Sequence, residues 1–224
     1  MTAKRGLIIE HGDDAPPARL AEWCDERGLT FDVVRAGERP LPDPAPFAFV
    51  VSLGSEESAG ARSPAWIARE LDVLRDAVAA EVPVLGLCFG GQALSVALGA
   101  QRPARLPAPE VGWLELDSFD QDIPRGPWLF YHNEQLRLAP GARELARGPA
   151  GPAAFSCGPH LGLQFHPEVD AALVASWART DPYLPASGLT PEELAAQSAR
   201  YAAGAREHAF ALFDAWLAHA LAAR

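Results

Sequence analysis

Cysteines and long apolar runs are scarce in this sequence. Three cysteines occur, at positions 24, 88 and 157, and their odd number and wide spacing fit neither a disulfide framework nor a CxxC zinc site. A reducing, cytoplasmic setting is therefore expected, in which a conspicuous cysteine is a free thiol. No apolar run approaches the roughly 20 residues of a membrane span, and the acidic start of the chain does not resemble a signal peptide.

Basic residues are also in the minority. The chain carries 19 Lys and Arg against 29 Asp and Glu, which gives a formal net charge of −10. Because nucleic acid and anionic membranes repel such a surface, we expect neither as a partner. With 224 residues, 49% of them hydrophobic and 21% charged, the chain can bury one large core, and wholesale disorder is excluded. No repeat or linker divides it, so we expect a single domain over residues 1–224.

The first half of the chain alternates short apolar segments with helical patterns. Several of the segments are apolar on both sides, which is typical of a parallel sheet covered by helices on both faces. The sequence therefore predicts an α/β fold. Its strands are expected at 6–10, 31–34, 47–53 and 82–87, and its helices at 17–27, from an N-cap at Ser63 onward, and at 91–98.

The second half gives weaker signals. Residues 101–128 hold many prolines and predict loops and short strands, antiparallel ones among them, and further strands are expected at 128–131 and 161–165. A helical extension should cover about 170–224. Its last helix begins at the capping box of Thr190 to Glu193 and runs toward Leu221, with a break near Gly204.

Cys88 lies where the buried strand expected at 82–87 passes directly into a helix. Glycines two positions before it and two and three positions after it permit a sharp turn, whose apex residue is strained and projects its side chain. The helix N-terminus offers partial positive charge, which favours a thiolate, and the N–H of Phe89 lies where an oxyanion can form. A buried structural cysteine is the alternative, but it would not need the glycines. Core packing or incidental burial is expected for Cys24 and Cys157.

His166 is the best candidate for the base that a cysteine nucleophile needs. It precedes Pro167, which favours an extended backbone, and in an extended chain residues two apart point to the same side. Glu168 can therefore accept a hydrogen bond from Nδ1 and leave Nε2 facing the sulfur.

His132 and Glu134 form a second pair with the same spacing. Two histidines and two carboxylates could hold zinc or iron, but a metal site would leave the glycine-flanked cysteine unexplained. We therefore expect no metal and no cofactor. The remaining histidines have no partner pattern and are interpreted as structural or exposed: His11, His160, His208 and His219.

Two segments resemble the signatures of the class I (triad) glutamine amidotransferases. Residues 86–92 match the GxCxGxQ elbow, and residues 165–168 match the second signature, FHPE, in the same order along the chain. The likeness extends over about 5–170 and is greatest to stand-alone proteins similar to the glutaminase domain of GMP synthase. The resemblance implies a flavodoxin-like, three-layer fold with C-terminal helices, and cleavage of the γ-amide of glutamine.

The resemblance also implies roles for individual residues. Cys88 would be the nucleophile, His166 the acid and base, and Glu168 its orienting partner. The N–H groups of Phe89 and Gly54 would form the oxyanion hole, although the loop 52–56 has one glycine and no proline where the family often has two glycines and a proline. The amino-acid end of the substrate would be held by Gln92, Tyr131, Asn133 and Glu134.

Three functions remain open at this point. In the first, the enzyme releases ammonia from glutamine to a separate partner synthetase. In the second, it works alone and hydrolyses a γ-glutamyl amide of a larger amine. In the third, the chain is a catalytically weak binding or regulatory subunit that keeps the elbow for structure.

Overall fold

The computed structural model describes residues 5–180 and 183–222, so residues 1–4, 181–182 and 223–224 of the predicted domain lie outside the described residues. The strands are β1 (Arg5–Glu10), β2 (Thr30–Arg35), β3 (Phe49–Ser52), β4 (Val84–Leu87), β5 (Ala104–Leu114), β6 (Ser118–Phe119), β7 (Trp128–Gln135), β8 (Arg143–Gly148), β9 (Gly151–Cys157) and β10 (His160–Leu163). The helices are α1 (Ala18–Glu26), α2 (Trp66–Ala79), α3 (Phe89–Ala97), α4 (Ala171–Thr180), the 3-10 helix η1 (Leu184–Ser187) and α5 (Pro191–Ala222).

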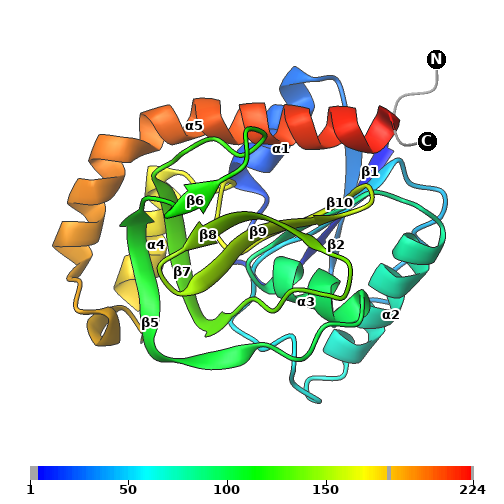
Figure 1. Cartoon of the computed structure of the whole chain (residues 1–224), viewed down its shortest axis with the longest axis horizontal. Helices are drawn as coiled ribbons and strands as arrows, with labels where there is room; N and C mark the ends of the chain where they lie inside the picture. Colours follow the sequence, from blue (N-terminus) through cyan, green and yellow to red (C-terminus); the bar gives the residue numbers. More distant parts are fainter. Residues whose placement is uncertain (1–4, 181–182, 223–224) are drawn as a thin grey trace.

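Eight strands form one large sheet, in the order β2-β1-β3-β4-β10-β9-β8-β6 (Figure 1). The five strands from β2 to β10 pair in parallel, whereas β9, β8 and β6 extend the sheet with antiparallel pairs. Strands β5 and β7 pair separately as an antiparallel ribbon. The predicted α/β class with a mostly parallel central sheet is confirmed.

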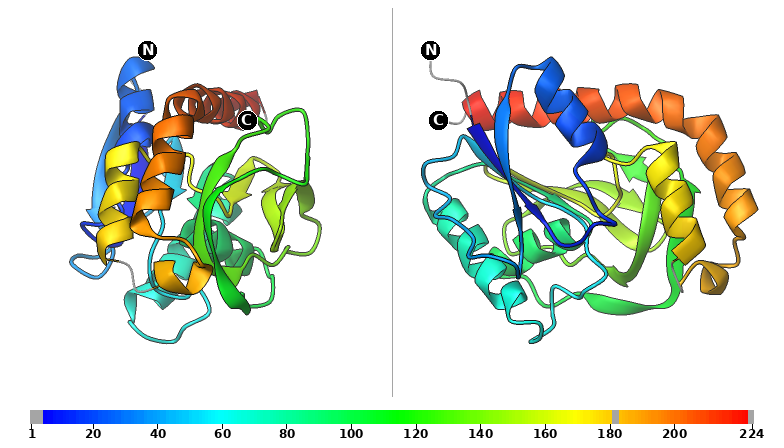
Figure 2. Two further views of the ribbon diagram at one scale, coloured as in Figure 1. Left: turned by 90° about the vertical axis from the view of Figure 1, so that its left-hand side faces the viewer. Right: turned by 180° about the vertical axis from the view of Figure 1, so that it is seen from behind.

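Helices cover both faces of the sheet because successive strand residues point to opposite sides. Ile8 and Leu85 belong to a core shared with α1 and the C-terminal half of α5. Their neighbours Leu7 and Val84 belong to a second core shared with α2 and α3. The three layers can be followed in Figures 1 and 2, where α5 runs along one side of the molecule and α1 lies against it.

The small ribbon has a core of its own. Val111 and Trp113 of β5 and Leu129 of β7 pack against α4, η1 and the first half of α5. The register of β5 against β7 shifts between Arg105 and Glu110, the stretch that holds two of the prolines of the segment. The segment predicted as loops and short strands thus contains a strand of 11 residues, which is antiparallel to its neighbour.

Helix α2 begins later than predicted. Its N-cap position is Ala65, without a side-chain cap, and its first helical residue is Trp66, so the N-cap predicted at Ser63 is wrong. The carbonyl oxygen of Pro64 accepts the N–H of Ile67 at 3.2 Å. This bond spans three residues, so the chain makes a turn before the α-helical pattern begins.

Helix α5 is continuous, and the break predicted near Gly204 is wrong. Its predicted capping box is confirmed: Thr190 N–H donates to Glu193 at 2.9 Å, and Glu193 N–H donates to the Thr190 hydroxyl at 3.2 Å. A glycine costs roughly 1 kcal/mol relative to alanine within a helix, and burial of Ala202 and Ala205 offsets that cost. Over residues 5–180 and 183–222, no helix is both long and apolar enough to cross a bilayer.

Strands β8 and β9 were not predicted, and β10 ends two residues earlier than expected. Alanine, glycine and proline are frequent in residues 143–157, and these residues have low strand propensity. These strands form because β10 offers a hydrogen-bonding edge to β9, which pairs with β8 in turn. Tertiary pairing therefore overrides the local preference.

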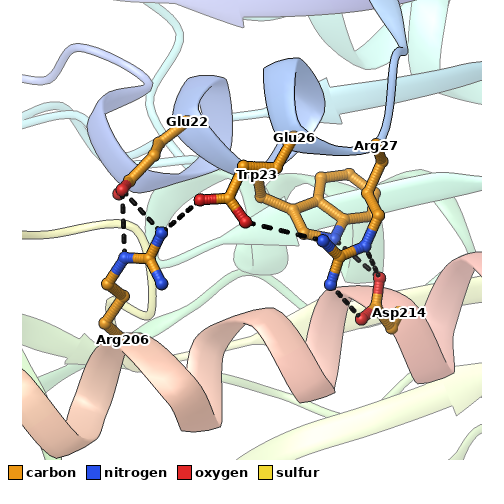
Figure 3. A network of polar contacts seen from close by, with 6 residues as sticks. All are labelled: Glu22, Trp23, Glu26, Arg27, Arg206 and Asp214. Carbon is orange, nitrogen blue, oxygen red and sulfur yellow. Dashed lines mark hydrogen bonds and ion pairs between the residues drawn. The ribbon is translucent and has the colours of Figure 1, made fainter.

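Polar side chains connect α1 to α5 on the surface (Figure 3). Asp214 accepts hydrogen bonds from both Arg27 nitrogens, at 2.9 and 2.7 Å, and from the Trp23 indole at 2.8 Å. Arg206 binds Glu22 at 2.7 Å and Glu26 at 2.5 Å. Exposed pairs of this kind add little to stability, so we expect the apolar contacts beneath them to hold α5 on the sheet.

The packing of α5 gives a stability prediction. Phe213→Ala should lower the free energy of unfolding by about 3–5 kcal/mol, because it empties a fully buried position whose ring centroid lies 5.4 Å from that of Trp23. Arg206→Ala, the matched change on the exposed side of the same helix, should cost much less. Urea unfolding followed by circular dichroism measures both losses, and equal losses would contradict this account.

Candidate active site

Cys88 lies at a sharp turn between β4 and α3. Its backbone has φ of 52° and ψ of −106°, a conformation that residues with side chains rarely adopt. Three neighbouring glycines permit the turn. A Cβ added to Gly86 would lie 2.3 Å from the oxygen of Gly90, one on Gly91 would lie 2.3 Å from the oxygen of Leu163, and one on Gly90 would lie 2.0 Å from a carbonyl oxygen of β3. The turn is therefore possible only where all three positions lack side chains.

Strand pairing brings Cys88 and His166 to the same edge of the sheet. Strands β4 and β10 are parallel neighbours, with Leu87 opposite Leu163, so the residues that follow them emerge together. The N–H of Cys88 donates to the Leu163 carbonyl at 2.9 Å, and the N–H of His166 donates to the Leu129 carbonyl of β7 at 2.8 Å. Two backbone bonds thus hold the two residues in place.

His166 and Glu168 form a buried pair. Nδ1 of His166 lies 2.7 Å from Oε1 of Glu168, and both side chains are 4% exposed. The pair forms across a turn after the end of β10, where an extended strand was expected. The Glu168 backbone is held by α1, because its carbonyl accepts the N–H of Arg19 at 2.9 Å. The Trp177 ring of α4 packs edge-on against the imidazole, with ring centroids 5.0 Å apart.

The environment of His166 favours its protonated form. Burial by itself lowers the pKa of His166. The Glu168 carboxylate and the Cys88 sulfur raise it by more than burial lowers it, so the net pKa rises from 6.5 to about 10. Nε2 is buried and has no nitrogen or oxygen partner among the described residues, and a hydrogen bond with the Cys88 sulfur is among the causes of the raised pKa. It is therefore available to the sulfur, whose charge acts on the ring.

Gln164 is a neighbour of the sulfur that the sequence analysis did not single out. Its Nε2 donates to Cys88 Sγ at 3.7 Å, while its Oε1 accepts from Gln92 at 3.1 Å and from the Leu136 N–H at 3.0 Å. The amide orientation is thereby set, since both acceptor bonds require oxygen on one side. The Tyr131 carbonyl oxygen lies 3.9 Å from the sulfur on another side.

Two backbone N–H groups next to the site lack acceptors. Within the described part of the chain, neither the N–H of Gly54 nor that of Phe89 makes a hydrogen bond to protein. Phe89 follows Cys88 directly, and a Cβ on Gly54 would lie only 3.1 Å from Cε1 of His166. Two unpaired donors therefore flank the space between the sulfur and the imidazole.

A cleft opens over the sulfur. It encloses about 840 Å³ when the open space at its mouth is included. Its lining contains four acidic residues and, among the described residues, no lysine or arginine. The predicted substrate-binding residues Gln92, Tyr131, Asn133 and Glu134 all line it. Gln92 already donates to the Glu134 carbonyl at 3.0 Å and so holds this loop against α3.

The two His-x-Glu pairs do not form a metal site. His132 Nε2 lies 2.7 Å from Glu110, and Glu134 accepts a hydrogen bond from the Ser58 hydroxyl at 2.7 Å. His132 and Glu134 are therefore engaged with other residues and not with the pair at 166 and 168. Within the described ranges, no group of three or more potential ligands could hold a metal ion.

Comparison with known proteins begins with sequence relatives. No family model matches the chain. The glutamine-hydrolysing GMP synthase of Aeropyrum pernix is 36% identical over 96 residues, which make up 39% of this chain and 19% of that protein. The imidazole glycerol phosphate synthase subunit HisH of Symbiobacterium thermophilum is 32% identical over 141 residues, which make up 50% of this chain and 66% of the subunit. These matches cover only part of each relative.

The fold as a whole is shared with a solved structure. A glutamine amido transferase from Methylobacillus flagellatus superposes with a TM-score of 0.84 at 25% identity, over 97% of this chain and 96% of that one. The chain is a relative of the class I glutamine amidotransferases. The flavodoxin-like fold implied by the two signatures is confirmed.

Three residues of the site carried no recognisable sequence signal. No sequence pattern singled out Trp177 or Gln164, and His11 was interpreted as structural or exposed. Helical spacing cannot tell a core tryptophan from one that covers an imidazole. His11 contacts Gly54 and Glu70, which are 43 and 59 positions away in the sequence.

The buried pair gives a titration prediction. The ring proton on Cε1 of His166, followed by NMR, should titrate well above its ordinary pKa of 6.5. Glu168→Gln should lower that pKa, because a neutral amide no longer favours the imidazolium. Glu110→Gln, which removes the partner of His132 instead, should leave the titration of His166 unchanged. An unshifted His166 in Glu168→Gln would contradict this account.

Proposed function

We propose that this chain hydrolyses the γ-amide of a glutamyl substrate, with Cys88 as the nucleophile, His166 as acid and base and Glu168 as its orienting partner. The observation that carries the proposal is the cysteine at the strained turn, which opens into a cleft beside a buried histidine–carboxylate pair. A packed structural cysteine would need neither the three glycines nor the buried pair. The relationship to glutamine amidotransferases supports the same chemistry.

Acylation comes first. The Cys88 thiolate attacks the γ-carbonyl carbon, a C–S bond forms, and the carbonyl oxygen becomes an oxyanion. The N–H groups of Gly54 and Phe89, which make no hydrogen bond to the described residues, would bind that oxygen. Loss of one such donor typically costs about 2.7–4 kcal/mol of barrier. The C–N bond then breaks as the His166 imidazolium gives its proton to the leaving nitrogen. The products are an amine and a γ-glutamyl thioester.

Deacylation returns the enzyme to its starting state. Neutral His166 takes a proton from water, which attacks the thioester and forms a second oxyanion in the same place. The C–S bond breaks, glutamate leaves, and the thiolate–imidazolium pair is restored. The high pKa of His166 suits this cycle, because the resting ring already carries the proton that the leaving amine needs.

Ammonia is the product that the relatives favour. One of them is a glutamine-hydrolysing GMP synthase, and another is a subunit of a synthase. We therefore infer that the chain takes glutamine, which Gln92, Tyr131, Asn133 and Glu134 would hold by its amino-acid end. The ammonia would pass to a separate partner synthetase. A cytoplasmic setting and a single domain over 1–224 remain predictions.

A larger leaving amine is the second candidate, and the cleft supports it. Its acidic lining, without lysine or arginine among the described residues, favours a cationic amine. Under this proposal the chain works alone on γ-glutamyl amides.

The nucleophile is tested by Cys88→Ala. This variant should release no glutamate and keep the wild-type circular dichroism spectrum, whereas Cys157→Ser, the matched change at a cysteine outside the cleft, should keep full activity. An electrophilic glutamine analogue should add its mass at Cys88 of the wild type. Full turnover by Cys88→Ala would overturn the proposal, and a wild type without the mass shift would instead indicate a binding subunit.

The leaving group is tested by a substrate panel. We compare kcat/KM for glutamine, for the γ-glutamyl amide of a diamine and for that of a neutral alkylamine of equal length. Glutamine should be the best substrate if ammonia is the product. A preference for the diamine amide that weakens with added salt would favour the stand-alone hydrolase, because salt screens the acidic cleft.

A further inference from the structure

His11 lies behind the loop that follows β3, with its side chain 1% exposed. Its Nδ1 lies 2.9 Å from the carbonyl oxygen of Gly54, and its Nε2 lies 2.7 Å from Glu70, a residue of α2 with a fully buried side chain. The Ser52 hydroxyl donates to the other carboxylate oxygen of Glu70 at 2.6 Å. We call His11, Glu70 and Ser52 the His11 network. Its hydrogen bonds end on the backbone of Gly54.

The partners of His11 determine where its protons lie. A carbonyl oxygen can only accept a hydrogen bond, so Nδ1 must carry a proton toward Gly54. The contact between Nε2 and the Glu70 carboxylate needs a second proton, held between the two groups. Burial lowers the pKa of His11, but Glu70, the Gly54 carbonyl and Glu10 raise it, and the net pKa lies above the ordinary value. Nδ1 of His11 therefore keeps its proton and donates a hydrogen bond to the Gly54 carbonyl oxygen.

Gly54 is held from both sides. The carbonyl of the preceding peptide unit, that of Leu53, accepts the N–H of Gly90 at 3.1 Å, and the carbonyl of the following unit is bound by His11. In a planar trans peptide the N–H points opposite to the carbonyl. The bond from the Gly90 N–H to the Leu53 carbonyl therefore sets the direction of the unpaired Gly54 N–H. The bond from His11 to the Gly54 carbonyl fixes the next peptide unit, so the Gly54 Cα lies between two anchored units.

Aromatic rings keep the imidazole in place. The His11 ring stacks on Trp66 with centroids 4.9 Å apart and meets Phe89 edge-on at 4.8 Å. Phe89 is also the residue whose N–H follows the sulfur. His11 is thus in contact with both residues whose N–H groups are the proposed oxyanion donors: it binds the Gly54 carbonyl oxygen and packs against the Phe89 ring.

We propose that His11, supported by Glu70 and Ser52, is a positioning residue that anchors the peptide unit after Gly54, holds the loop that carries the Gly54 N–H against the elbow, and so keeps the oxyanion hole formed in the isolated chain. This inference rests on the proposed function, since it concerns the same site. His11 touches neither the sulfur nor the His166 ring by any contact described above, and it acts through the backbone of Gly54. An isolated chain should consequently be active without a partner protein.

The test compares two replacements of nearly equal shape. His11→Asn keeps a side-chain N–H close to the place of Nδ1, whereas His11→Leu removes it, and both leave Glu70 without its histidine. His11→Leu should lower kcat about 10²–10³-fold, the effect of one lost oxyanion donor, with little change in KM. His11→Asn should keep most of the wild-type kcat. His160→Leu, at a buried histidine at the other end of β10, is the control and should keep kcat.

A second measurement separates positioning from general damage. Alkylation of Cys88 by iodoacetamide forms no oxyanion, so its rate should be the same in the wild type, His11→Asn and His11→Leu. Equal kcat values for the two His11 variants would overturn the inference. A parallel fall of kcat and alkylation rate in His11→Leu would overturn it as well, because the damage would then extend to the nucleophile.

Crystal structures of both variants give a readout that does not need turnover. The Gly54 carbonyl should keep its direction in His11→Asn and lose it in His11→Leu, and the same direction in both would overturn the inference. If the wild type hydrolyses no γ-glutamyl amide, the proposed function fails, and these structures still decide whether His11 orients Gly54. The two failures are therefore distinguishable.

Discussion

The structure depends on the close approach of three backbone segments at the end of β4. The chain turns at Cys88 while touching β3 on one side and β10 on the other, and no side chain fits at Gly86, Gly90 or Gly91. Only this approach allows α3 to begin directly behind the sulfur. It also places the Gly90 N–H against the Leu53 carbonyl, so the elbow and the loop after β3 are coupled by a backbone bond.

Two buried histidine–carboxylate pairs flank Gly54 and do different work. The pair of His166 and Glu168 faces the cleft, and the raised pKa of His166 favours a protonated ring next to the sulfur. The pair of His11 and Glu70 faces away from the cleft and holds a backbone carbonyl. An isolated buried charge is costly, so each histidine is found with a carboxylate within hydrogen-bonding distance. Under our proposals, the same kind of pair serves proton transfer at His166 and backbone positioning at His11.

The C-terminal helices contribute to the site as well as to the core. Trp177 of α4 packs on the His166 ring and donates its indole N–H to the carbonyl oxygen of Asp14 at 2.5 Å. Arg19 of α1 donates its backbone N–H to Glu168 and its side chain to the carbonyl oxygen of Ala202 in α5 at 2.7 Å. The proposed triad is therefore tied to the extension that covers it, which limits how freely that extension can differ without affecting the chemistry.

The α/β class, most of the parallel strands and the elbow at Cys88 could be predicted from the amino-acid sequence, because hydrophobic periodicity and glycine spacing are local properties. The sequence also paired His166 with Glu168, two positions apart. It did not reveal the hairpin β8–β9 or the start of α2, where tertiary pairing and a preceding turn override local preference. The contacts of Gln164, Trp177 and His11 with the site could not be predicted, since they join segments far apart in the chain and leave no local pattern.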